Sequence, residues 1–490
     1  MVNLHVKHAS KVYDVSVDAS ESGIALKQQL EALTGVPSAR QKVMVKGRQL
    51  QDDQALSGLK DGQALFMLGS KPAEPTEKAA EAGKPAETGP VEAQPEEDEE
   101  DVYEEPLGLV NIGNSCYANA TLEALHTVPE LNQALTKYRG PDQLLSAWGQ
   151  LVPQFGERSS QAAPTPLSFL MRLQQRFPQF GERGEDGLPK QQDAEEFWTQ
   201  LMWELRAVDT PEMRDVAASF DGQFKVTTER AGEEHVESVE DFTKLMCHIS
   251  IHTNFLKDGL RASLVDEAET SSGGLKSSKR IAKLPKYLTV QFVRFFWRRD
   301  THKNSKILRK VTFPLNLDLG DLCTPELQAR MAPAREAYRE LEDAIEENKR
   351  AARRAKFTRI DAVPEDPADE SSAAKRRAAA LAEQQEEDKD KQRLADLKTK
   401  FTTSIDPDLA ADPSGSPHGL YELQAVVTHQ GMSADSGHYQ CFTRNNTKEN
   451  SWWRFNDDRV SEVDENRIAQ LAGGGASDSA LILLYRSADY

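Results

Sequence analysis

Apolar and polar residues alternate in different ways along this chain, and the changes divide it into segments. Residues 1 to about 69 combine the period-two alternation typical of half-buried strands with one stretch of helical spacing. "NLHVKHASKVYDVSV" predicts two strands around a polar turn, and "SGIALKQQLEALTGV" predicts a helix that stops before Pro37. "QKVMVKGRQLQDD" then predicts two short strands around a glycine, and "ALFML" predicts a final strand.

The order strand, strand, helix, strand, strand, with "QKVMVKGRQLQDD" in its middle, resembles ubiquitin. Residues 1–69 are therefore expected to form a ubiquitin-like β-grasp domain. No Gly-Gly tail ends it, because "FMLGSKPAEPTEK" runs straight on, so a fused recognition module is predicted. The resemblance implies an apolar docking patch on the sheet, formed by Met44 and Met67 or Leu68 with His8 beside them. The alternative is that these apolar residues belong to the core.

Two segments contain too few apolar residues to build a core of their own. Residues 70–105 are rich in Pro, Ala, Glu and Lys and predict a flexible acidic linker. Residues from about 324 to 417 include "EAYRELEDAIEENKRAARRAK" and "KRRAAALAEQQEEDKDKQRLADLKTK", which predict exposed charged helices that could pair as a hairpin. Strand-like segments precede and follow them, so we expect an insertion within one larger domain that spans 106–490.

Composition narrows the class of protein. The 79 acidic and 60 basic residues give a formal net charge of −19, which argues against a general binder of nucleic acid or of anionic membranes. Four widely separated cysteines fit neither a disulfide framework nor a cysteine-rich zinc site, and they favour a reducing compartment. The chain begins without the long apolar stretch of a signal peptide and contains no run of 18 apolar residues. A soluble protein of the cytoplasm or nucleus is expected.

One cysteine stands where a thiol could be activated. Cys116 follows two glycines and two asparagines in "GLVNIGNSCYANATLEAL", just where a turn gives way to a run of helical spacing. A helix N-terminus or a neighbouring imidazole lowers the pKa of a thiol and makes it a nucleophile. The alternative is a small buried thiol at the start of a helix.

The imidazole is expected from "HQGMSADSGHYQCFT", where His438 ends a Gly/Ser loop and begins a strand. "SWWRFNDDRV" follows, and a returning strand would bring Asn456 or Asp457 beside the His438 ring to orient it. His429 is the rival base, but its alternating context favours a half-buried structural histidine. His248 and His252 in "CHISIHTN" are four residues apart, a spacing that could bind a metal if the segment were a helix. Its composition favours a strand, so no metal site is predicted there.

Four segments in order resemble the signature boxes of the ubiquitin-specific protease family, over a region from about residue 106 to the C-terminus. They are "GLVNIGNSCYANATLEAL", "QQDAEEF", "LPKYLTVQFVRF", and "SGHYQCF" with "WWRFNDDRV". The fused ubiquitin-like domain and the ending "LAGGGASDSALILLYR" resemble its proteasome-associated branch. The resemblance implies an α+β fold of a papain-like kind, with a helical lobe starting at Cys116 packed on a β-rich lobe carrying His438.

The resemblance also implies the roles of site residues. Cys116 would be the nucleophile, His438 the general base, and Asn111 a side-chain donor to the oxyanion. The third triad position is Asn456, where many relatives have Asp, and Asp457 is the alternative. A neutral amide still orients the ring, because Cys-His-Asn sets work in papain-like proteases.

The "QQDAEEF" box is implied to bind the substrate. Asp193 and Glu196 would hold arginines of the ubiquitin tail, and carboxylates suit guanidinium groups. Glu195 is instead expected on the exposed side of its helix. The chain lacks the paired CxxC motifs with which many relatives bind zinc, so packing alone is expected to hold the fingers region.

The function implied is that of a deubiquitinating thiol hydrolase, which cleaves the bond after the C-terminal glycine of ubiquitin without a cofactor. Its expected partners are ubiquitin, polyubiquitinated proteins and the regulatory particle of the 26S proteasome, which the ubiquitin-like domain would bind. Low activity of the free enzyme and activation by docking are also implied, with "HQGMSADSGHY" as the gate. Two rivals stay open at this point: a proteasome-docking scaffold that acts without cleavage, and a protease for a related modifier.

Overall fold

We describe a computed structural model of the chain, which divides into two compact units, Met1–Glu99 and Glu100–Tyr490, each described by itself. The residues that the structure describes are 2–8, 11–18, 22–34, 36, 38, 42–45, 48–50, 63–68, 105–155, 163–184, 187, 189–230, 235–270, 273–298, 303–360, 370–433, 436–475 and 478–488. Most of the predicted linker, 70–105, lies outside them.

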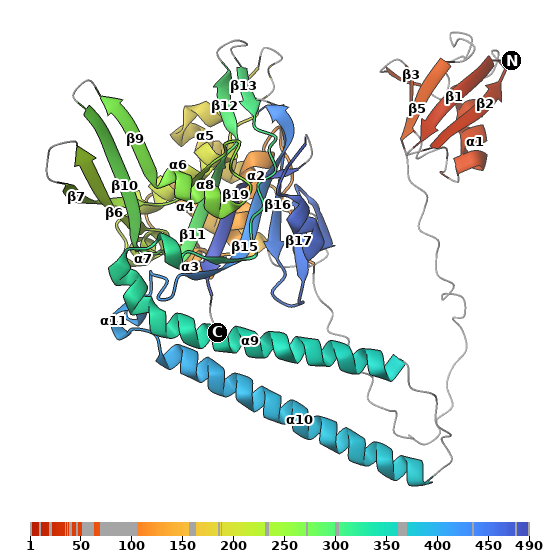
Figure 1. Cartoon of the computed structure of the whole chain (residues 1–490). Helices are drawn as coiled ribbons and strands as arrows, with labels where there is room; N and C mark the ends of the chain where they lie inside the picture. Colours follow the sequence, from red (N-terminus) through yellow and green to blue (C-terminus); the bar gives the residue numbers. More distant parts are fainter. Residues whose placement is uncertain are drawn as a thin grey trace. The chain divides into compact units, whose positions relative to one another are not determined.

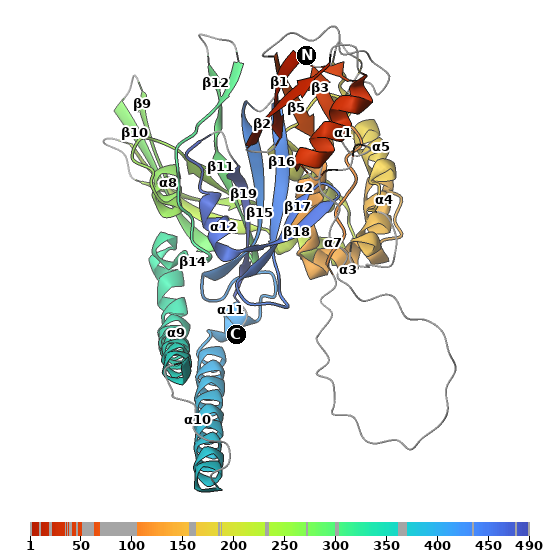
Figure 2. The same ribbon diagram turned by 90° about the vertical axis from the view of Figure 1, so that its right-hand side faces the viewer.

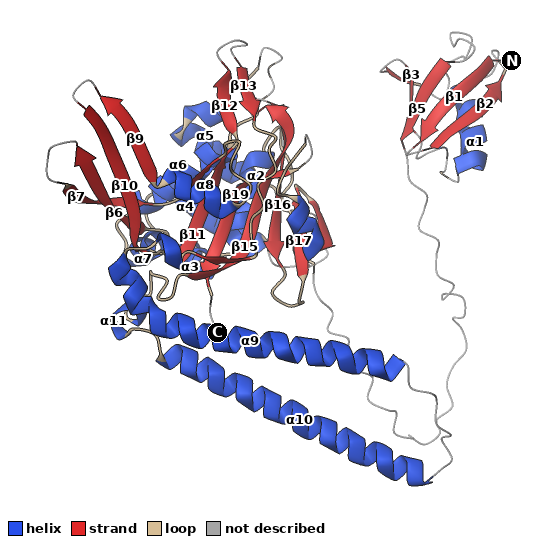
Figure 3. Ribbon diagram, in the orientation of Figure 1, coloured by secondary structure: helices blue, strands red, loops and turns tan. Residues whose placement is uncertain are grey.

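Among its described residues, the first unit has a five-stranded sheet, in the strand order β2-β1-β5-β3-β4, and one helix (Figures 1 and 3). Its elements are β1 (Val2–His8), β2 (Lys11–Val17), α1 (Gly23–Thr34), β3 (Lys42–Val45), β4 (Arg48–Gln49) and β5 (Gln63–Leu68). β1 pairs with β2 antiparallel and with β5 parallel. Alternating residues of the strands and helical-period residues of α1 form a single buried core, which includes Val6, Leu30 and Leu65. The order predicted segment by segment is confirmed, with the two short strands of "QKVMVKGRQLQDD" as β3 and β4 and the strand "ALFML" as part of β5.

The three residues expected in the docking patch lie on adjacent strands. The backbone of His8 pairs with Met67, that of Met44 with Phe66, and that of Leu68 with Lys42. Their side chains lie outside the described residues, so the patch stays a prediction.

The second unit begins with a helical lobe. Its members are α2 (Cys116–His126), α3 (Pro129–Lys137), α4 (Gln143–Leu151), α5 (Leu167–Arg176), α6 (Ala194–Ala207) and α7 (Pro211–Ala218), with single 3₁₀ turns at Val152–Gln154 and Pro178–Gly181. Local chemistry fixes several starts: Asp142 and Thr210 accept hydrogen bonds from the first turns of α4 and α7, and prolines occupy the first positions of α3 and α7.

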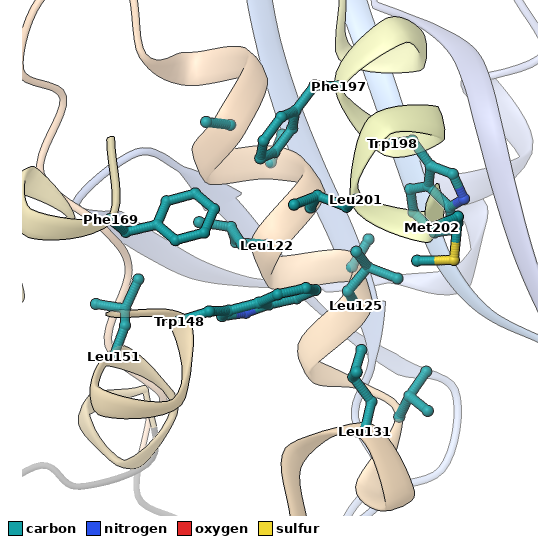
Figure 4. Close-up of a cluster of buried hydrophobic side chains, with 14 of the residues drawn as sticks. Leu122, Leu125, Leu131, Trp148, Leu151, Phe169, Phe197, Trp198, Leu201 and Met202 are labelled. Carbon is teal, nitrogen blue, oxygen red and sulfur yellow. The ribbon is translucent and has the colours of Figure 1, made fainter. Parts of the chain in front are cut away.

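Helix α2 is the centre of this lobe. Ten of its eleven residues are buried, so it behaves as a core helix and not as an amphipathic surface helix. Figure 4 shows Leu122 and Leu125 on α2 among Trp148, Phe169 and Phe197 from α4, α5 and α6. Such close packing holds the N-terminus of α2 in a defined position.

A large sheet crosses the unit in the order β18-β17-β16-β15-β19-β11-β8, with β14 beside β15. Its strands are β8 (Leu245–His248), β11 (Tyr287–Val293), β14 (Asn316–Asp318), β15 (Leu420–Ser433), β16 (Ser436–Arg444), β17 (Ser451–Asn456), β18 (Arg459–Asp464) and β19 (Ser479–Ser487). One face packs on the helical lobe and the other on α8 (Leu256–Ser263) and α12 (Glu465–Gln470), so Leu483 and Leu484 of β19 enter different cores (Figure 2). Burial on both faces explains the continuous apolar run "ALILLY".

A second, four-stranded sheet, β7-β6-β10-β9, forms the fingers region. Its strands are β6 (Gly222–Arg230), β7 (Val236–Phe242), β9 (Val265–Thr270) and β10 (Gly273–Lys283). The rings of Phe224 and Phe242 stack at 4.3 Å, and Lys279 pairs across strands with Glu240. Ion pairs thus support this sheet in addition to the packing that the sequence predicts.

The predicted insertion forms two long helices, α9 (Pro325–Ile360) and α10 (Glu370–Thr403), which lie side by side (Figures 1 and 2); α11 (Pro407–Ala410) follows them. The expectation of uniformly exposed helices is wrong for the first turns of α9. Met331, Ala334, Ala337 and Leu341 there are buried, because their spacing of three to four residues forms one apolar stripe. β15, which follows the insertion, and β11, which precedes it, flank β19 in the same sheet, so the domain is closed in space.

Candidate active site

Cys116 begins α2 after a turn that only particular residues can form. Gly113 and Asn114 both have positive φ, at 97° and 51°, a region that glycine and asparagine tolerate better than other residues. Asn111 stabilises the turn, because its Oδ1 accepts hydrogen bonds from the backbone N–H groups of Gly113 at 3.0 Å and Ser115 at 3.3 Å. The asparagines and glycines before Cys116 therefore shape the backbone that presents it.

The Cys116 thiol is buried, with a residue exposure of 2%. Burial raises its pKa to about 11, a hydrogen bond with the backbone of Tyr439 opposes this, and the negative charge of Asp457 raises the pKa further. Tyr439 follows His438 on β16, against which α2 packs. The structure thus brings Cys116 next to the strand that carries His438.

His438 lies two residues inside β16, because β15 and β16 extend further into the Gly/Ser segment than the sequence predicts. The two strands form a hairpin whose register shifts between Gln430 and Ser433. Gly437 has a φ of +148°, and a Cβ there would lie 2.2 Å from the Gln430 carbonyl oxygen. The glycine before His438 is required by this close approach.

Asn456, the last residue of β17, is the partner of the imidazole. His438 Nε2 lies 2.6 Å from Asn456 Oδ1, and Asp457 Oδ2 is farther away, at 3.8 Å. An amide oxygen only accepts, so Nε2 carries the hydrogen, and Nδ1 is the ring nitrogen that can take up a proton. The pairing of β16 with β17 is the returning strand expected from the sequence.

Asp457 has a different set of contacts. Its carboxylate accepts hydrogen bonds from Asn111 Nδ2 and Asn119 Nδ2, both at 2.9 Å. Asn119 is buried on α2 and also donates to the carbonyl of Leu109 at 3.2 Å. One N–H of the Asn111 amide is thus held by Asp457, and its second N–H remains a donor.

Sequence reasoning missed two residues of this network, Asn119 and Gly108. A Cβ on Gly108 would lie 2.1 Å from the carbonyl oxygen of Asp457, which also accepts a hydrogen bond from the N–H of Leu109 at 3.1 Å. Both residues belong to the "GLVNIGNSCYANATLEAL" segment. The asparagine three residues after the cysteine, in the same segment, was the available signal.

The segment before α6 also reaches the site. Gln191 Nε2 donates to the carbonyl of Gly437 at 2.6 Å, and the Tyr117 ring contacts Phe197 edge-on at 5.5 Å. Asp193 caps α6, since its Oδ1 accepts from the N–H of Glu195 at 2.8 Å, and burial raises its pKa. These contacts fix the N-terminal end of α6 beside the start of α2.

The three acidic residues of "QQDAEEF" differ in environment. Glu196 is exposed on the first turn of α6, and its Oε1 lies 3.4 Å from Gln179 Nε2. Glu195 forms an ion pair with Lys244, from the turn between β7 and β8, and accepts a hydrogen bond from Thr199 at 3.0 Å. The expectation that Glu195 is merely exposed is therefore wrong.

The rival base, His429, has structural surroundings. His429 is fully buried between Phe295 and Tyr439, and burial lowers its pKa to about 3. Lys306 donates to its carbonyl at 2.5 Å. His248 is exposed at the end of β8 and His252 lies in the following turn. Within the described ranges, no group of His, Cys, Asp and Glu could hold a metal ion, and no helix is both long and apolar enough to cross a membrane.

A buried thiol at a helix start, an imidazole oriented by an amide and a fixed side-chain N–H donor are the parts of acyl transfer through a thioester. Family models agree with this chemistry. Residues 107–485 match the model "Ubiquitin carboxyl-terminal hydrolase", and residues 4–72 match the model "Ubiquitin family". The chain belongs to the ubiquitin carboxyl-terminal hydrolase family.

Similar proteins extend over the whole chain. "Ubiquitin carboxyl-terminal hydrolase 6" of Schizosaccharomyces pombe is 37% identical over 500 residues, which cover 100% of this chain and 99% of that protein. A protein of the same printed name from Arabidopsis thaliana is 36% identical, with 99% of each chain covered. "Ubiquitin carboxyl-terminal hydrolase 14" of Caenorhabditis elegans is 29% identical over 99% of this chain and 93% of its own.

The chain is thus a deubiquitinating cysteine peptidase with an N-terminal ubiquitin-like domain. This confirms the predicted fold class, α+β with a β-grasp domain and a ubiquitin-specific protease domain, and the predicted enzyme class.

Proposed function

We propose that this enzyme removes ubiquitin from substrates held at the proteasome and that docking there activates it. Cys116 is the nucleophile, His438 the general base and acid, Asn456 its orienting partner, and Asn111 an oxyanion donor. The observation that carries the catalytic assignment is the 2.6 Å contact between His438 Nε2 and Asn456 Oδ1, next to the strand against which Cys116 lies.

The reaction follows from the hydrogen positions. His438 Nδ1 takes the thiol proton as Cys116 Sγ attacks the carbonyl carbon of the C-terminal glycine of ubiquitin. The second N–H of Asn111 donates to the oxyanion that forms. The imidazolium then gives its proton to the leaving lysine amine, which yields a thioester, and a water deprotonated by His438 hydrolyses it.

The third member of the set can be tested directly. Asn456→Ala removes the acceptor of the imidazole N–H, and we expect kcat to fall about 100-fold or more, as for other orienting residues. Asp457→Ala should also lower kcat, but less than Asn456→Ala does, because it acts through the orientation of Asn111. If Asp457→Ala lowered kcat more than Asn456→Ala did, the two roles would be exchanged.

The resting thiol supports activation by docking. With a pKa of about 11, only a small fraction of Cys116 is thiolate near neutral pH. The β15–β16 hairpin carries His438, and Lys306 ties it to the neighbouring pair β12 (Phe295–Arg298) and β13 (Lys303–Lys306). A shift of the β15–β16 hairpin would change the contact between Tyr439 and the thiol, so docking that moves it can activate the enzyme.

The remaining assignments concern partners. Asp193 and Glu196 hold arginines of the ubiquitin tail, and the ubiquitin-like domain binds the regulatory particle of the proteasome through the patch that includes Met44, Leu68 and His8. The enzyme works in the cytoplasm and nucleus, where proteasomes are. The match of residues 4–72 to the ubiquitin family supports the docking role.

The test uses ubiquitin with a C-terminal electrophile, added to the protein alone and to the protein mixed with proteasomes. Labelling should require Cys116 and rise with proteasomes. Cys116→Ala is the negative control and Cys323→Ala the matched control, because Cys323 is an equally buried thiol in the other core of the same domain.

Each part of the proposal can fail separately. Labelling that survives Cys116→Ala would overturn the nucleophile. Equal labelling with and without proteasomes would overturn activation by docking and leave the catalytic assignment intact. Deletion of residues 1–69 should abolish the stimulation but not the basal labelling.

A further inference from the structure

Helix α6 carries an aromatic side chain that its packing does not explain. Trp203 is 69% exposed, whereas Trp148, Trp198 and Trp452 are each only 2% exposed. Figure 4 shows that the opposite face of α6, with Trp198, Leu201 and Met202, points into the core of the helical lobe. Exposing an indole forgoes the burial of a large apolar surface, so this residue is a candidate for contact with a partner.

The position of Trp203 relates it to the substrate. Glu196, Gln200 and Trp203 are spaced four and three residues apart, which places them along one line of α6. Trp203 lies seven residues beyond Glu196, or about 10 Å along the helix axis at 1.5 Å per residue. The line therefore begins at a residue assigned to the ubiquitin tail and ends at the indole.

The direction of α6 decides which part of the substrate passes over this line. The N-terminal end of the helix lies beside the start of α2, through the contact of Tyr117 with Phe197 and the hydrogen bond of Gln191 to Gly437. The scissile end of ubiquitin is at Cys116, so the tail passes Asp193 and Glu196 first. The folded body of ubiquitin follows the tail and comes next along α6.

The helix presents the indole rigidly. On one flank Glu195 pairs with Lys244, and on the other Glu204 pairs with Arg176 at 3.1 Å. Two ion pairs that tie α6 to neighbouring segments reduce the ordering that binding would require. Just beyond Trp203, Ala207 lines a hollow of about 570 Å³, so the surface there is concave and not blocked.

We propose that Trp203 is a contact for the folded body of ubiquitin and gives this enzyme preference for whole ubiquitin over its tail. The proposal rests on the proposed function, because it assumes that the tail lies at Asp193 and Glu196. Trp is one of the residue types enriched among the interface positions that dominate binding. The contact is made equally in ground and transition states, so it should act on KM and not on kcat.

The experiment compares two fluorogenic substrates in the presence of proteasomes: whole ubiquitin with a C-terminal coumarin, and a peptide of the last five ubiquitin residues with the same group. Trp203→Ala should raise KM for the ubiquitin substrate about tenfold or more without changing kcat. It should leave kcat/KM for the peptide within twofold. Trp203→Phe should restore most of the affinity, because it keeps an aromatic surface.

Met171→Ala is the matched control, because Met171 is an exposed apolar residue, 53% accessible, on the neighbouring helix α5. Met171→Ala should change neither kcat nor KM for either substrate. A Trp203→Ala enzyme that loses equal activity on both substrates, or no more on ubiquitin than Met171→Ala does, would overturn the proposal. The Kd of fluorescent ubiquitin for the Cys116→Ala protein, measured with and without Trp203→Ala, tests the same contact without turnover, and Trp203→Ala should raise it.

These outcomes separate this inference from the proposed function. A wild-type enzyme that hydrolyses neither substrate, or whose Cys116 is dispensable, contradicts the proposed function. A wild-type enzyme that hydrolyses both, with Trp203→Ala indistinguishable from it, contradicts only the role of Trp203.

Discussion

Gly108→Ala is expected to lower the activity of the enzyme strongly although Gly108 is no part of the proposed catalytic set. The added Cβ would lie 2.1 Å from the carbonyl oxygen of Asp457 and 3.1 Å from its carbonyl carbon. A Cβ atom essentially never lies closer than 3.0 Å to another non-bonded heavy atom, so the backbone at Gly108 and the backbone at Asp457 must separate by about 0.9 Å. The two Asp457 atoms are backbone atoms, so a change of side-chain rotamer cannot relieve the contact.

The separation acts on Asn111, which we propose as the oxyanion donor. Asp457 orients Asn111 and Asn119, and the N–H of Leu109 donates to the Asp457 carbonyl. Loss of that backbone hydrogen bond costs about 1 kcal/mol of folding free energy. A displacement of about 1 Å in a positioning group costs roughly 100-fold in rate. We therefore expect kcat to fall 10- to 100-fold in a protein that still folds.

The assay is steady-state hydrolysis of ubiquitin–coumarin with proteasomes present, together with thermal unfolding of each variant. Gly181→Ala is the matched control, since its Cβ would meet only the Gln174 side chain at 3.5 Å or more. A Gly108→Ala enzyme with kcat within twofold of wild type and an unchanged melting temperature would refute the reasoning.

Three further results are expected. Burial raises the pKa of Glu123 well above its usual value of 4.5, so above pH 4.5 the folded state keeps a proton that the unfolded state releases. The free energy of unfolding should therefore fall by up to about 1.4 kcal/mol per pH unit as the pH rises above 4.5. Urea unfolding between pH 5 and 8 should show this dependence in the wild type and not in Glu123→Gln. The Arg294 guanidinium donates to four backbone carbonyls, so Arg294→Met should lower the free energy of unfolding by roughly 2–4 kcal/mol. A melting temperature within 2 °C of wild type would contradict this. Asp457→Asn removes a negative charge that raises the pKa of Cys116, so the pH profile of Cys116 alkylation should move to lower pH, and an unmoved profile would exclude the charge effect. Its kcat should fall, because the orientation of Asn111 is disturbed.

Local patterns in the chain were enough to predict much of the architecture. Period-two alternation and one helical stretch predict the order of elements in the first unit, because each half-buried strand or amphipathic helix carries its own signature. The charged insertion is visible for the same reason, since helices with few apolar residues leave a distinct composition. The turn before Cys116 is also local: it needs residues that accept positive φ, and the chain supplies Gly113 and Asn114.

Contacts between distant segments needed the tertiary structure. Asn456 and Asp457 are neighbours with similar side chains, and only the pairing of β16 with β17 shows that Asn456 reaches His438 while Asp457 turns to Asn111. The ion pair of Glu195 joins α6 to a turn far along the chain, so nothing near Glu195 in the sequence announces it.

Burial is the other property that the sequence leaves open. The first turns of α9 belong to the charged insertion, yet they bury Met331 in a core of the domain. Trp203 is the opposite case, because large aromatic side chains are usually mostly buried and the structure leaves this one exposed. By itself, the sequence determined the elements and the residue types that can do the chemistry, because those depend on near neighbours. Which of them meet, and which remain exposed, depends on how the sheet and the helices pack, and only the tertiary structure decided that.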